Sequence, residues 1–442
     1  MKTNEQRSRA ESRRRVAAVA LVGVVSLAAC GTDADGSSLD RPGSTDMTTS
    51  TTEPATSTSE PETSTTGPDT TAISPDPTDA AAGSAPASST PPGPRLAALQ
   101  TVLDDARAQL PAADATIQAA VVSRGVGLEW ASTSGPDTEP DRPFRMASVG
   151  KTFTAATVLR LVETGRIGLD DPIGALLTPD TVALLEDDGY DLAMITVAQL
   201  LQHTAGLYDY AFGDGSPFLT DALADRRRVW TRREQLELAT SVGDPLWAPG
   251  DAFAYSDTGY VLLGEIIEVE TGRPYADAMR DLLGFERLGL DHLWLEHGQA
   301  APDDLLPMSR SFFGADEVSD LDFSLDAFGG GGLAGTTTDV ARFFGALFDG
   351  EVFVDPNSLA TMTTVPPTNV GQEEFGILLG DGGHGVYRMT VAGQECWSHR
   401  GFLGTIAMAC PGTGTAVVVT TNTALTDPLP IATALLELTL AT

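Results

Sequence analysis

The chain has 442 residues, of which 61 are acidic and 27 are basic, and its formal net charge is −34. Proteins that bind nucleic acids neutralise phosphates with basic surfaces, so this composition argues against a nucleic-acid partner. The arginines clustered at positions 226–233 are the one local exception, and a solvated helix face explains them.

The first 29 residues have the pattern of a secretory signal peptide. Basic residues at positions 2–15 precede an apolar, small-residue run at 16–29, which is too short for a stable membrane span. The run ends in Leu27-Ala28-Ala29-Cys30, which resembles the bacterial lipobox, whose cysteine becomes the lipidated first residue of the mature protein. The alternative is an ordinary signal peptide followed by a chance cysteine. We expect secretion across the bacterial cytoplasmic membrane and a lipoprotein at its outer face, held there only by the N-terminal lipid anchor.

The segment that follows has the composition of a disordered tether. Residues 31–94 are almost exclusively Ser, Thr, Pro, Gly, Asp and Ala, and they include no Phe, Trp or Tyr. Such a segment buries too little apolar area to offset its chain entropy. The sequence therefore divides into a signal peptide (1–29), a lipidated cysteine with its tether (30–94) and one hydrolase-sized domain (95–442).

Helical and strand patterns divide the predicted domain into three parts. Residues 95–110 have helical spacing, and 117–122 and 128–132 have strand patterns. Near the C-terminus we expect four short strands and a final helix, at 387–391, 395–399, 405–410, 416–421 and 430–440. Strands at both ends of the domain with helical sequence between them predict an α+β fold. Its antiparallel sheet is formed by both termini and flanked by terminal helices, and an all-helical lobe is inserted.

Ser148 and Lys151 are the first candidate catalytic pair. Three residues apart on a helix, their side chains share one face, and the helix N-terminus favours an alkoxide and an oxyanion. Lys2 and Lys151 are the only lysines, and Lys2 belongs to the predicted signal peptide. The sequence thus uses arginine for its other cationic side chains, and arginine cannot lose its proton in a protein. We interpret Lys151 as the principal base for Ser148, which requires burial to lower its pKa.

Tyr255 and Asp257 form a second element, just before a predicted helix at 259–269. A phenol beside a lysine can carry a proton from the nucleophile to the leaving group. The alternative makes Tyr255 a core aromatic residue and Asp257 a helix N-cap.

A third element is His399-Arg400-Gly401, at the end of a predicted strand. The glycine would let a substrate backbone approach the strand edge. The amide of Phe402 would then join the amide of Ser148 in an oxyanion hole.

With these elements in order, the chain resembles the serine β-lactamase and DD-peptidase superfamily, in the branch with class C β-lactamases, similar DD-carboxypeptidases and related esterases. The motifs are S-x-x-K at 148–151, Y-x-D at 255–257 where the family has Y-x-N, and H-x-G at 399–401 in place of K-T-G. The segments at 200–207 and 331–339 also look like that branch. The resemblance covers residues 99–440 and implies a sheet with terminal helices, an all-helical lobe, and the site between them.

The resemblance implies acyl transfer through Ser148 and no cofactor. The expected substrates are D-alanyl peptides of the cell wall; the alternatives are an ester or a β-lactam on the same site, or a non-catalytic penicillin-binding or wall-associated protein. Asp257 removes an amide donor and adds a charge that would hold Lys151 protonated. Arg400 replaces a small hydroxyl residue, and it is expected either to bind a substrate carboxylate or to turn away from the cleft and meet an acidic side chain.

The remaining cysteines and histidines are given structural roles. Cys396 and Cys410 flank a predicted hairpin in an oxidising compartment, so a disulfide is favoured over metal binding. His292 and His297 lack an H-E-x-x-H pattern, and no metal site is expected. His203 ends a predicted helix before a glycine and is expected to cap or pack.

Overall fold

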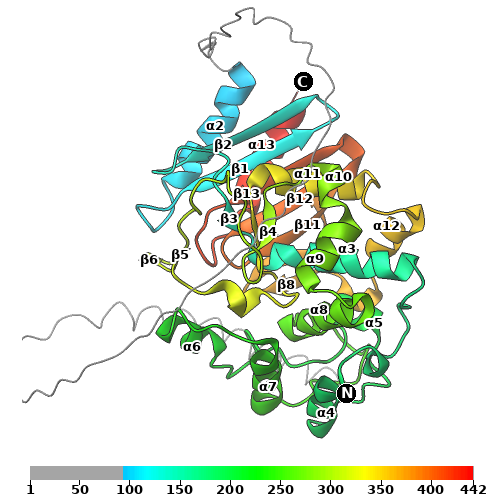
Figure 1. Ribbon diagram of the computed structural model, residues 1–442. Helices are drawn as coiled ribbons and strands as arrows, with labels where there is room; N and C mark the ends of the chain where they lie inside the picture. Colours follow the sequence, from blue (N-terminus) through cyan, green and yellow to red (C-terminus); the bar gives the residue numbers. More distant parts are fainter. Residues whose placement is uncertain (1–92, 442) are drawn as a thin grey trace, which may run out of the picture. The chain divides into compact units, whose positions relative to one another are not determined.

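The computed structural model describes residues 93–441 (Figure 1). The predicted signal peptide, Cys30 and nearly all of the predicted tether lie outside these residues. Among residues 93–441, no helix is both long enough and apolar enough to cross a membrane.

The centre of the fold is an eight-stranded antiparallel sheet with the strand order β2-β1-β13-β12-β11-β10-β9-β8. The strands are β1 (Ile117–Ser123), β2 (Leu128–Ser134), β8 (Gln372–Glu374), β9 (Ile377–Gly382), β10 (Tyr387–Val391), β11 (Gln394–Gly401), β12 (Thr405–Cys410) and β13 (Thr415–Thr420). The pairing of β1 with β13 joins the two ends of the domain. The predicted antiparallel sheet built from both termini is confirmed, and β8 and β9 extend it beyond the predicted strands.

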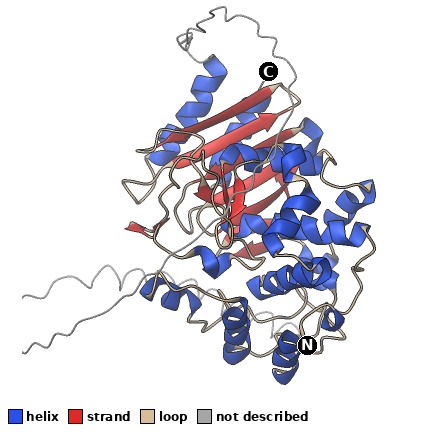
Figure 2. Ribbon diagram, viewed as in Figure 1, coloured by secondary structure: helices blue, strands red, loops and turns tan. Residues whose placement is uncertain are grey.

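Helices cover both faces of this sheet, as Figure 2 shows. The terminal helices α2 (Pro94–Arg107) and α13 (Leu429–Leu440) pack on one face, where Leu99, Leu103, Leu435 and Leu436 are buried against the strands. The helix α11 (Thr337–Phe348) packs on the other face. Because both faces are covered, β12 and β13 are buried along their whole length and read as continuous apolar runs.

The inserted region between β2 and β8 is mainly helical. Its helices are α3 (Gly150–Glu163), α4 (Pro179–Asp187), α5 (Val197–Leu201), α6 (Phe218–Ala224), α7 (Arg232–Val242), α8 (Asp257–Thr271), α9 (Tyr275–Leu283), α10 (Phe285–Leu288), α11 and α12 (Pro356–Met362). The region is not all-helical as predicted, because it also holds a small sheet of β3 (Phe144–Arg145), β7 (Leu333–Gly335) and β4 (Leu293–Leu295), and a hairpin of β5 (Phe312–Phe313) and β6 (Asp316–Glu317). Helix α3 is buried around most of its circumference, as its apolar sequence predicts.

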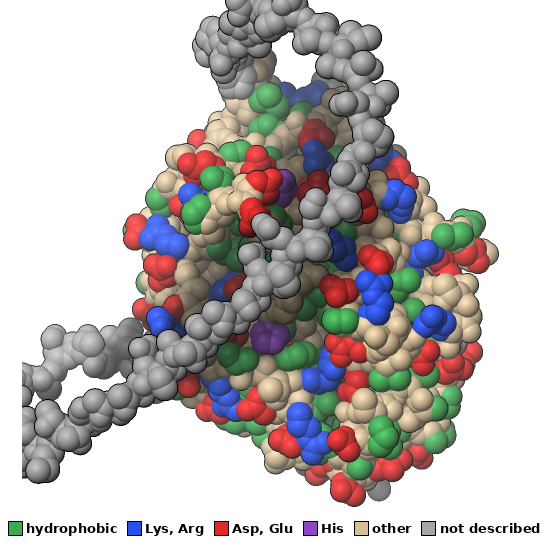
Figure 3. All heavy atoms as spheres, viewed as in Figure 1, with side chains coloured by type: hydrophobic (Ala, Val, Ile, Leu, Met, Phe, Trp, Pro, Cys, Tyr) green, Lys and Arg blue, Asp and Glu red, His purple; other side chains and the backbone are tan. Residues whose placement is uncertain are grey.

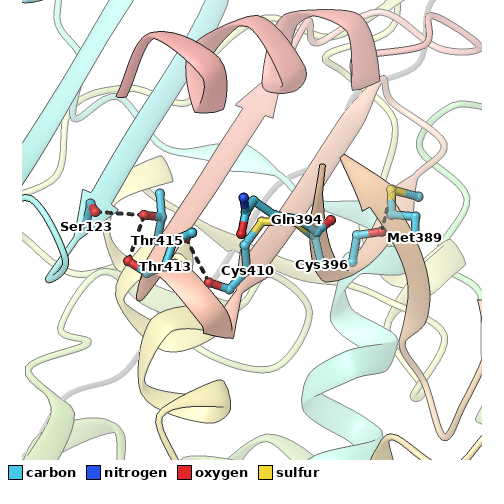
Figure 4. The surroundings of a disulfide bond; sticks show 8 residues. Ser123, Met389, Gln394, Cys396, Cys410, Thr413 and Thr415 are labelled. Carbon is cyan, nitrogen blue, oxygen red and sulfur yellow. Dashed lines mark hydrogen bonds between the residues drawn. A yellow bond between two sulfur atoms is a disulfide. The ribbon is translucent and has the colours of Figure 1, made fainter. Parts of the chain in front are cut away.

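A disulfide links Cys396 on β11 to Cys410 on β12, with the two Cα atoms 4.1 Å apart (Figure 4). The cysteines continue the register of the pair Trp397 and Ala409, so they lie opposite each other on neighbouring strands. Both are buried under the terminal helices. The structure thus forms the disulfide that the sequence favours.

The visible face in Figure 3 carries arginine side chains scattered among aspartates and glutamates. Several of the arginines at 226–233 are paired with acidic neighbours, among them Arg232 with Glu268 and Arg233 with Glu237. These pairs agree with the interpretation of this basic cluster as a solvated surface.

Candidate active site

Ser148 lies at a strained junction between a strand and a helix. Strand β3 leads through Met146 into a short 3-10 helix, Ala147–Val149, which continues as α3. Ala147 has a φ of 47°, in the left-handed region that non-glycine residues seldom adopt. Such a conformation costs on the order of 1–3 kcal/mol and persists where the surrounding structure enforces it.

The end of β11 packs directly against this junction. A Cβ atom at Gly401 would overlap the carbonyl oxygen of Met146, so only glycine allows the approach. We expected the glycine to admit a substrate backbone; in the structure it admits the chain's own backbone. The approach brings Phe402 next to Ser148, and both residues line the same pocket.

Lys151 is fully buried beneath Ser148. Its Nζ donates hydrogen bonds to Ser148 Oγ at 2.8 Å, to the carbonyl oxygen of Gly330 at 2.6 Å and to Asp257 Oδ1. These three acceptors match the three hydrogens of an ammonium group. Lys151 is therefore positioned as a charged donor to the serine hydroxyl.

The pKa of Lys151 is raised rather than lowered. Burial alone lowers the pKa of Lys151. The negative charge of Asp257 raises it, and the charges of Asp326 and Asp209 raise it further. The net lowering of the pKa that a free base requires is therefore not met, because the fold places three carboxylates around the amine, and Asp257 acts as expected in holding Lys151 protonated. A simple role for Lys151 as a free base does not follow from this geometry.

Asp209 and Asp326 are site residues that sequence reasoning missed. Burial, with the charge of Asp257 added, raises the pKa of each to about 7; the nearby Lys151 opposes the rise in both. Asp209 accepts hydrogen bonds from the backbone of Ala211 and of Asp257. The sequence did offer one signal: Asp209 closely follows the segment 200–207, and Asp326 closely precedes the segment 331–339, and both segments resemble the family.

Asp257 is a buried partner of Lys151 and not the N-cap of helix α8. The N-cap is Ser256, whose hydroxyl accepts from the backbone N–H of Gly259. The capping alternative for Asp257 is therefore wrong.

Tyr255 lies next to Ser148. Its phenol forms a hydrogen bond with Ser148, and Lys151 Nζ lies 5.1 Å from its ring centroid. Burial, followed by the charge of Asp257, raises its pKa well above the ordinary value, and the bond to Ser148 offsets this only in part. The phenol is thus protonated and able to donate.

His203 packs behind Tyr255, as expected of a structural histidine. The two rings stack with centroids 4.4 Å apart, and His203 Nδ1 accepts from the backbone N–H of Ser256. Burial, together with the charge of Lys151, lowers its pKa well below the ordinary value, so the ring is neutral. His203 therefore orients the segment that carries Tyr255.

His399 and Arg400 lie on opposite faces of the sheet. The ring of His399 lies 6.4 Å from that of Tyr255, and its Nδ1 donates to the carbonyl oxygen of Arg400 at 2.8 Å. Burial, assisted by Lys151, lowers the pKa of His399 to about 3. A neutral imidazole thus stands where the family has a lysine.

Arg400 faces the terminal helices instead. Its register partner on β12 is Ile406, which belongs to the core beneath α2 and α13. Its guanidinium pairs with Asp427, with Nη1 and Oδ1 2.6 Å apart, and Arg400 does not line the pocket at Ser148. The structure contradicts the prediction that Arg400 binds a substrate carboxylate, because strand alternation turns the side chain away.

Next to Ser148 is a narrow pocket of about 70 Å³. Its walls are mainly apolar, and they come from α6, the loop before it, the β5–β6 region and the turn after β11. The lining side chains include Tyr210, Phe212, Phe218, Leu219, Leu223, Phe313, Phe323, Phe402 and Leu403. The acidic and basic side chains in its wall are Asp257, Asp326 and Arg145.

The guanidinium of Arg145 already has partners within the protein. Its Nε donates to Glu296 at 2.8 Å, and its guanidinium lies 4.6 Å from the ring centroid of Phe323. Within residues 93–441, no group of three or more His, Cys, Asp or Glu residues is arranged to hold a metal ion. His292 contacts Asp304, with the nitrogen and oxygen 3.3 Å apart, away from Ser148.

Comparison with known proteins agrees with this arrangement. Penicillin-binding protein 4 of Amycolatopsis lactamdurans is 32% identical over 171 residues, which are 38% of each chain. Esterase EstB of Burkholderia gladioli is 34% identical over 181 residues, 39% of this chain and 45% of the esterase. The matches thus span less than half the length of these two curated relatives.

A solved structure matches over a longer range. A D-stereospecific amidohydrolase from Streptomyces sp. has a TM-score of 0.65 and 28% identity, over 78% of this chain and 98% of the amidohydrolase. The family model for Beta-lactamase matches residues 105–441, which include every candidate site residue described above. The protein therefore belongs to the Beta-lactamase family.

Proposed function

We propose that the protein is a serine hydrolase that cleaves an amide or ester through an acyl-enzyme on Ser148. The observation that carries this proposal is the position of the Ser148 hydroxyl, between the ammonium of Lys151 at 2.8 Å and the phenol of Tyr255. An activated serine beside proton-handling groups is the arrangement that nucleophilic catalysis requires.

The proton of Ser148 needs an acceptor, and Lys151 is already protonated. We propose that Lys151 passes one of its protons to Asp257 as it takes the proton of Ser148. Lys151 thus remains an ammonium and Asp257 becomes a neutral carboxylic acid while the serine oxygen attacks the carbonyl carbon. The amides of Ser148 and Phe402 then hold the oxyanion. Tyr255 donates its proton to the leaving group as the bond to carbon breaks, and the proton held by Asp257 returns through Lys151 to Tyr255. Water releases the acyl group by the reverse route.

D-Alanyl peptides of the cell wall are one candidate substrate. The similarity to a D-stereospecific amidohydrolase supports a substrate of D configuration. A carboxypeptidase also has to bind a terminal carboxylate beside the scissile bond. Arg145 and Arg400 both have carboxylate partners already, which disfavours that substrate and penicillins. The geometry is better suited to an amide or ester without a neighbouring carboxylate.

Mass spectrometry of the purified protein tests this function. A fluorophosphonate and a penicillin are applied separately, with Ser148→Ala as the control. We expect fluorophosphonate to label Ser148 and penicillin to label it weakly. Strong labelling by both reagents would restore the carboxypeptidase candidate, and no labelling by either would support a non-catalytic protein.

The location is a separate proposal that rests on residues 1–94 alone. We propose a lipoprotein at the outer face of the cytoplasmic membrane, attached through Cys30. Metabolic labelling with a radioactive fatty acid is expected to mark the wild type and not Cys30→Ala. Equal labelling of both would reject the anchor.

A further inference from the structure

The apolar pocket beside Ser148 is larger than a D-alanyl substrate needs. Its volume of about 70 Å³ is several times the roughly 10–15 Å³ that a single water molecule occupies on this measure. A methyl group would leave most of this space empty, whereas a phenyl or branched aliphatic group would fill it.

The pocket walls are built for apolar contact. Phe402 lies with its ring centroid 5.2 Å from Phe212 and 5.9 Å from Phe313, so three aromatic rings form one continuous wall. Leu219 and Leu223 of α6 pack against the same cluster, which is separate from the main core. Phe313, Phe402, Leu219 and Leu223 pack outside the main core, and together with Phe212 they can bury an apolar group of a substrate.

The position of Tyr255 indicates which part of the substrate enters. The leaving group has to reach the phenol of Tyr255 to receive a proton, so it lies on that side of Ser148. Among the described residues that line the pocket, Ser148 and Ala147 are present, whereas Tyr255 and His399 are absent. The pocket therefore reaches Ser148 from a side that Tyr255 does not line, which suits the acyl part that remains after the leaving group departs.

The charges at the inner end select against anions. Asp257 and Asp326 line the pocket next to Ser148, and the guanidinium of Arg145 is paired with Glu296. An acyl group with its own carboxylate would therefore meet carboxylates without a free cation to pair with.

We propose that this pocket binds the acyl part of the substrate and selects bulky, uncharged hydrocarbon groups, aromatic or branched aliphatic, over the methyl group of alanine and over anionic groups. This inference rests on the proposed acyl-enzyme at Ser148. It assigns the pocket a role in choosing the substrate, apart from the chemistry of bond cleavage.

A series of p-nitrophenyl esters tests the inference, because the leaving group stays constant while the acyl group changes. The acyl groups are acetyl, isovaleryl, phenylacetyl and hemisuccinyl. We expect kcat/KM for isovaleryl and phenylacetyl to exceed that for acetyl by about tenfold or more, and hemisuccinyl to be the poorest. Equal values across the series, or a preference for acetyl, would overturn the proposal.

Two tryptophan substitutions locate the selectivity. Leu219→Trp adds volume inside the pocket and is expected to lower the phenylacetyl-to-acetyl ratio about tenfold. Leu238→Trp, at a partly buried leucine of α7 outside the pocket, is the matched control and should leave the ratio unchanged. A similar loss in both variants, or no change in either, would contradict the assignment.

Fluorophosphonate labelling separates this inference from the function on which it depends. Labelled Ser148 without acyl selectivity rejects the pocket assignment and leaves the hydrolase intact. Absence of labelling together with absence of ester hydrolysis rejects the proposed function itself, and the pocket assignment with it.

Discussion

Lys151 of α3 and Asp257 of α8 form a buried ion pair, with exposed side-chain fractions of 0% and 4%. A buried pair of this kind is costly to break because the remaining charge has no solvent to stabilise it. Relatives with Y-x-N place a neutral amide where this chain has a second charge. The pair therefore distinguishes the proton chemistry of this site from that of the family pattern.

Asp257→Asn is expected to lower the pKa of Lys151, because it removes the nearest charge that raises it. In the proposed route wild-type Lys151 stays charged and hands a proton to the Asp257 carboxylate. Without that carboxylate, Lys151 has to lose a proton to solvent before it can accept the proton of Ser148. We therefore expect the acidic limb of the kcat/KM profile of the variant to follow the pKa of Lys151 and to lie at higher pH than in the wild type, by about one unit or more. Asp427→Asn, on the opposite face of the sheet, should leave the profile in place. An unshifted limb in Asp257→Asn would remove Asp257 from the proton pathway.

Lys151→Arg is expected to lower kcat/KM by about 10²–10⁴-fold, because arginine keeps the charge and cannot give up a proton. Ser148→Ala should abolish hydrolysis. Circular dichroism of both variants checks that the fold is kept. Retention of most activity in Lys151→Arg would show that the amine acts only as a fixed charge.

Asp326→Asn tests the stability cost of the carboxylate cluster. The pKa of Asp326 is about 7 in the folded protein, compared with an ordinary value of 3.8. Between these two values the folded state binds more protons than the unfolded state, so stability falls as pH rises from about 4 to about 7. We therefore compare the Tm of Asp326→Asn with that of the wild type at pH 8 and at pH 4. The difference, variant minus wild type, is expected to be more positive at pH 8 by about 2–4 °C. Asp303→Asn, at an exposed site, provides the control, and an equal effect of Asp326→Asn at both pH values would contradict the shift.

Removal of the disulfide is expected to destabilise the sheet near the candidate site. Closing the loop between Cys396 and Cys410, 14 positions apart, is worth about 3 kcal/mol on the chain-entropy model. The double variant Cys396→Ser, Cys410→Ser should lose this amount in denaturant unfolding, and reduction of the wild type should give the same loss. Alkylation of both thiols in denatured, unreduced wild type would show that the bond does not form.

Arg400→Thr is expected to affect a free-acid peptide and its methyl ester equally, because the guanidinium pairs with Asp427 on the face away from the pocket. The comparison uses kcat/KM on both substrates. A much larger loss on the free acid would return Arg400 to the substrate site.

The sheet and the S-x-x-K motif could be read from the sequence because their signals are local. Strands such as β12 and β13 are unbroken apolar runs, and Ser148 and Lys151 are neighbours on one helix. By contrast, β9 has the sequence Ile-Leu-Leu-Gly-Asp-Gly, whose glycines suggest a turn, and pairing with β10 overrides that preference.

The carboxylates around Lys151 could not be found in this way. Asp209 and Asp326 are far from Lys151 in the sequence, and only the packing of the inserted region brings them to it. An isolated aspartate in a loop is usually exposed, so its local sequence gives no sign of burial. The direction of Arg400, in contrast, could be predicted from the sequence. Neighbouring residues on a strand point to opposite faces of the sheet, so a His399 that faces the site turns Arg400 away from it.

The pairing of β1 with β13 also constrains how the chain is made. Residues 117–123 emerge from the ribosome almost 300 positions before residues 415–420, which complete their hydrogen bonding. The central strand pair therefore remains open through most of synthesis, and contacts between such distant segments slow folding. A nascent chain that has not yet reached residue 415 has no β13 and no α13, which leaves β1 with an unpaired edge. Completion of the sheet thus waits for the synthesis of β13.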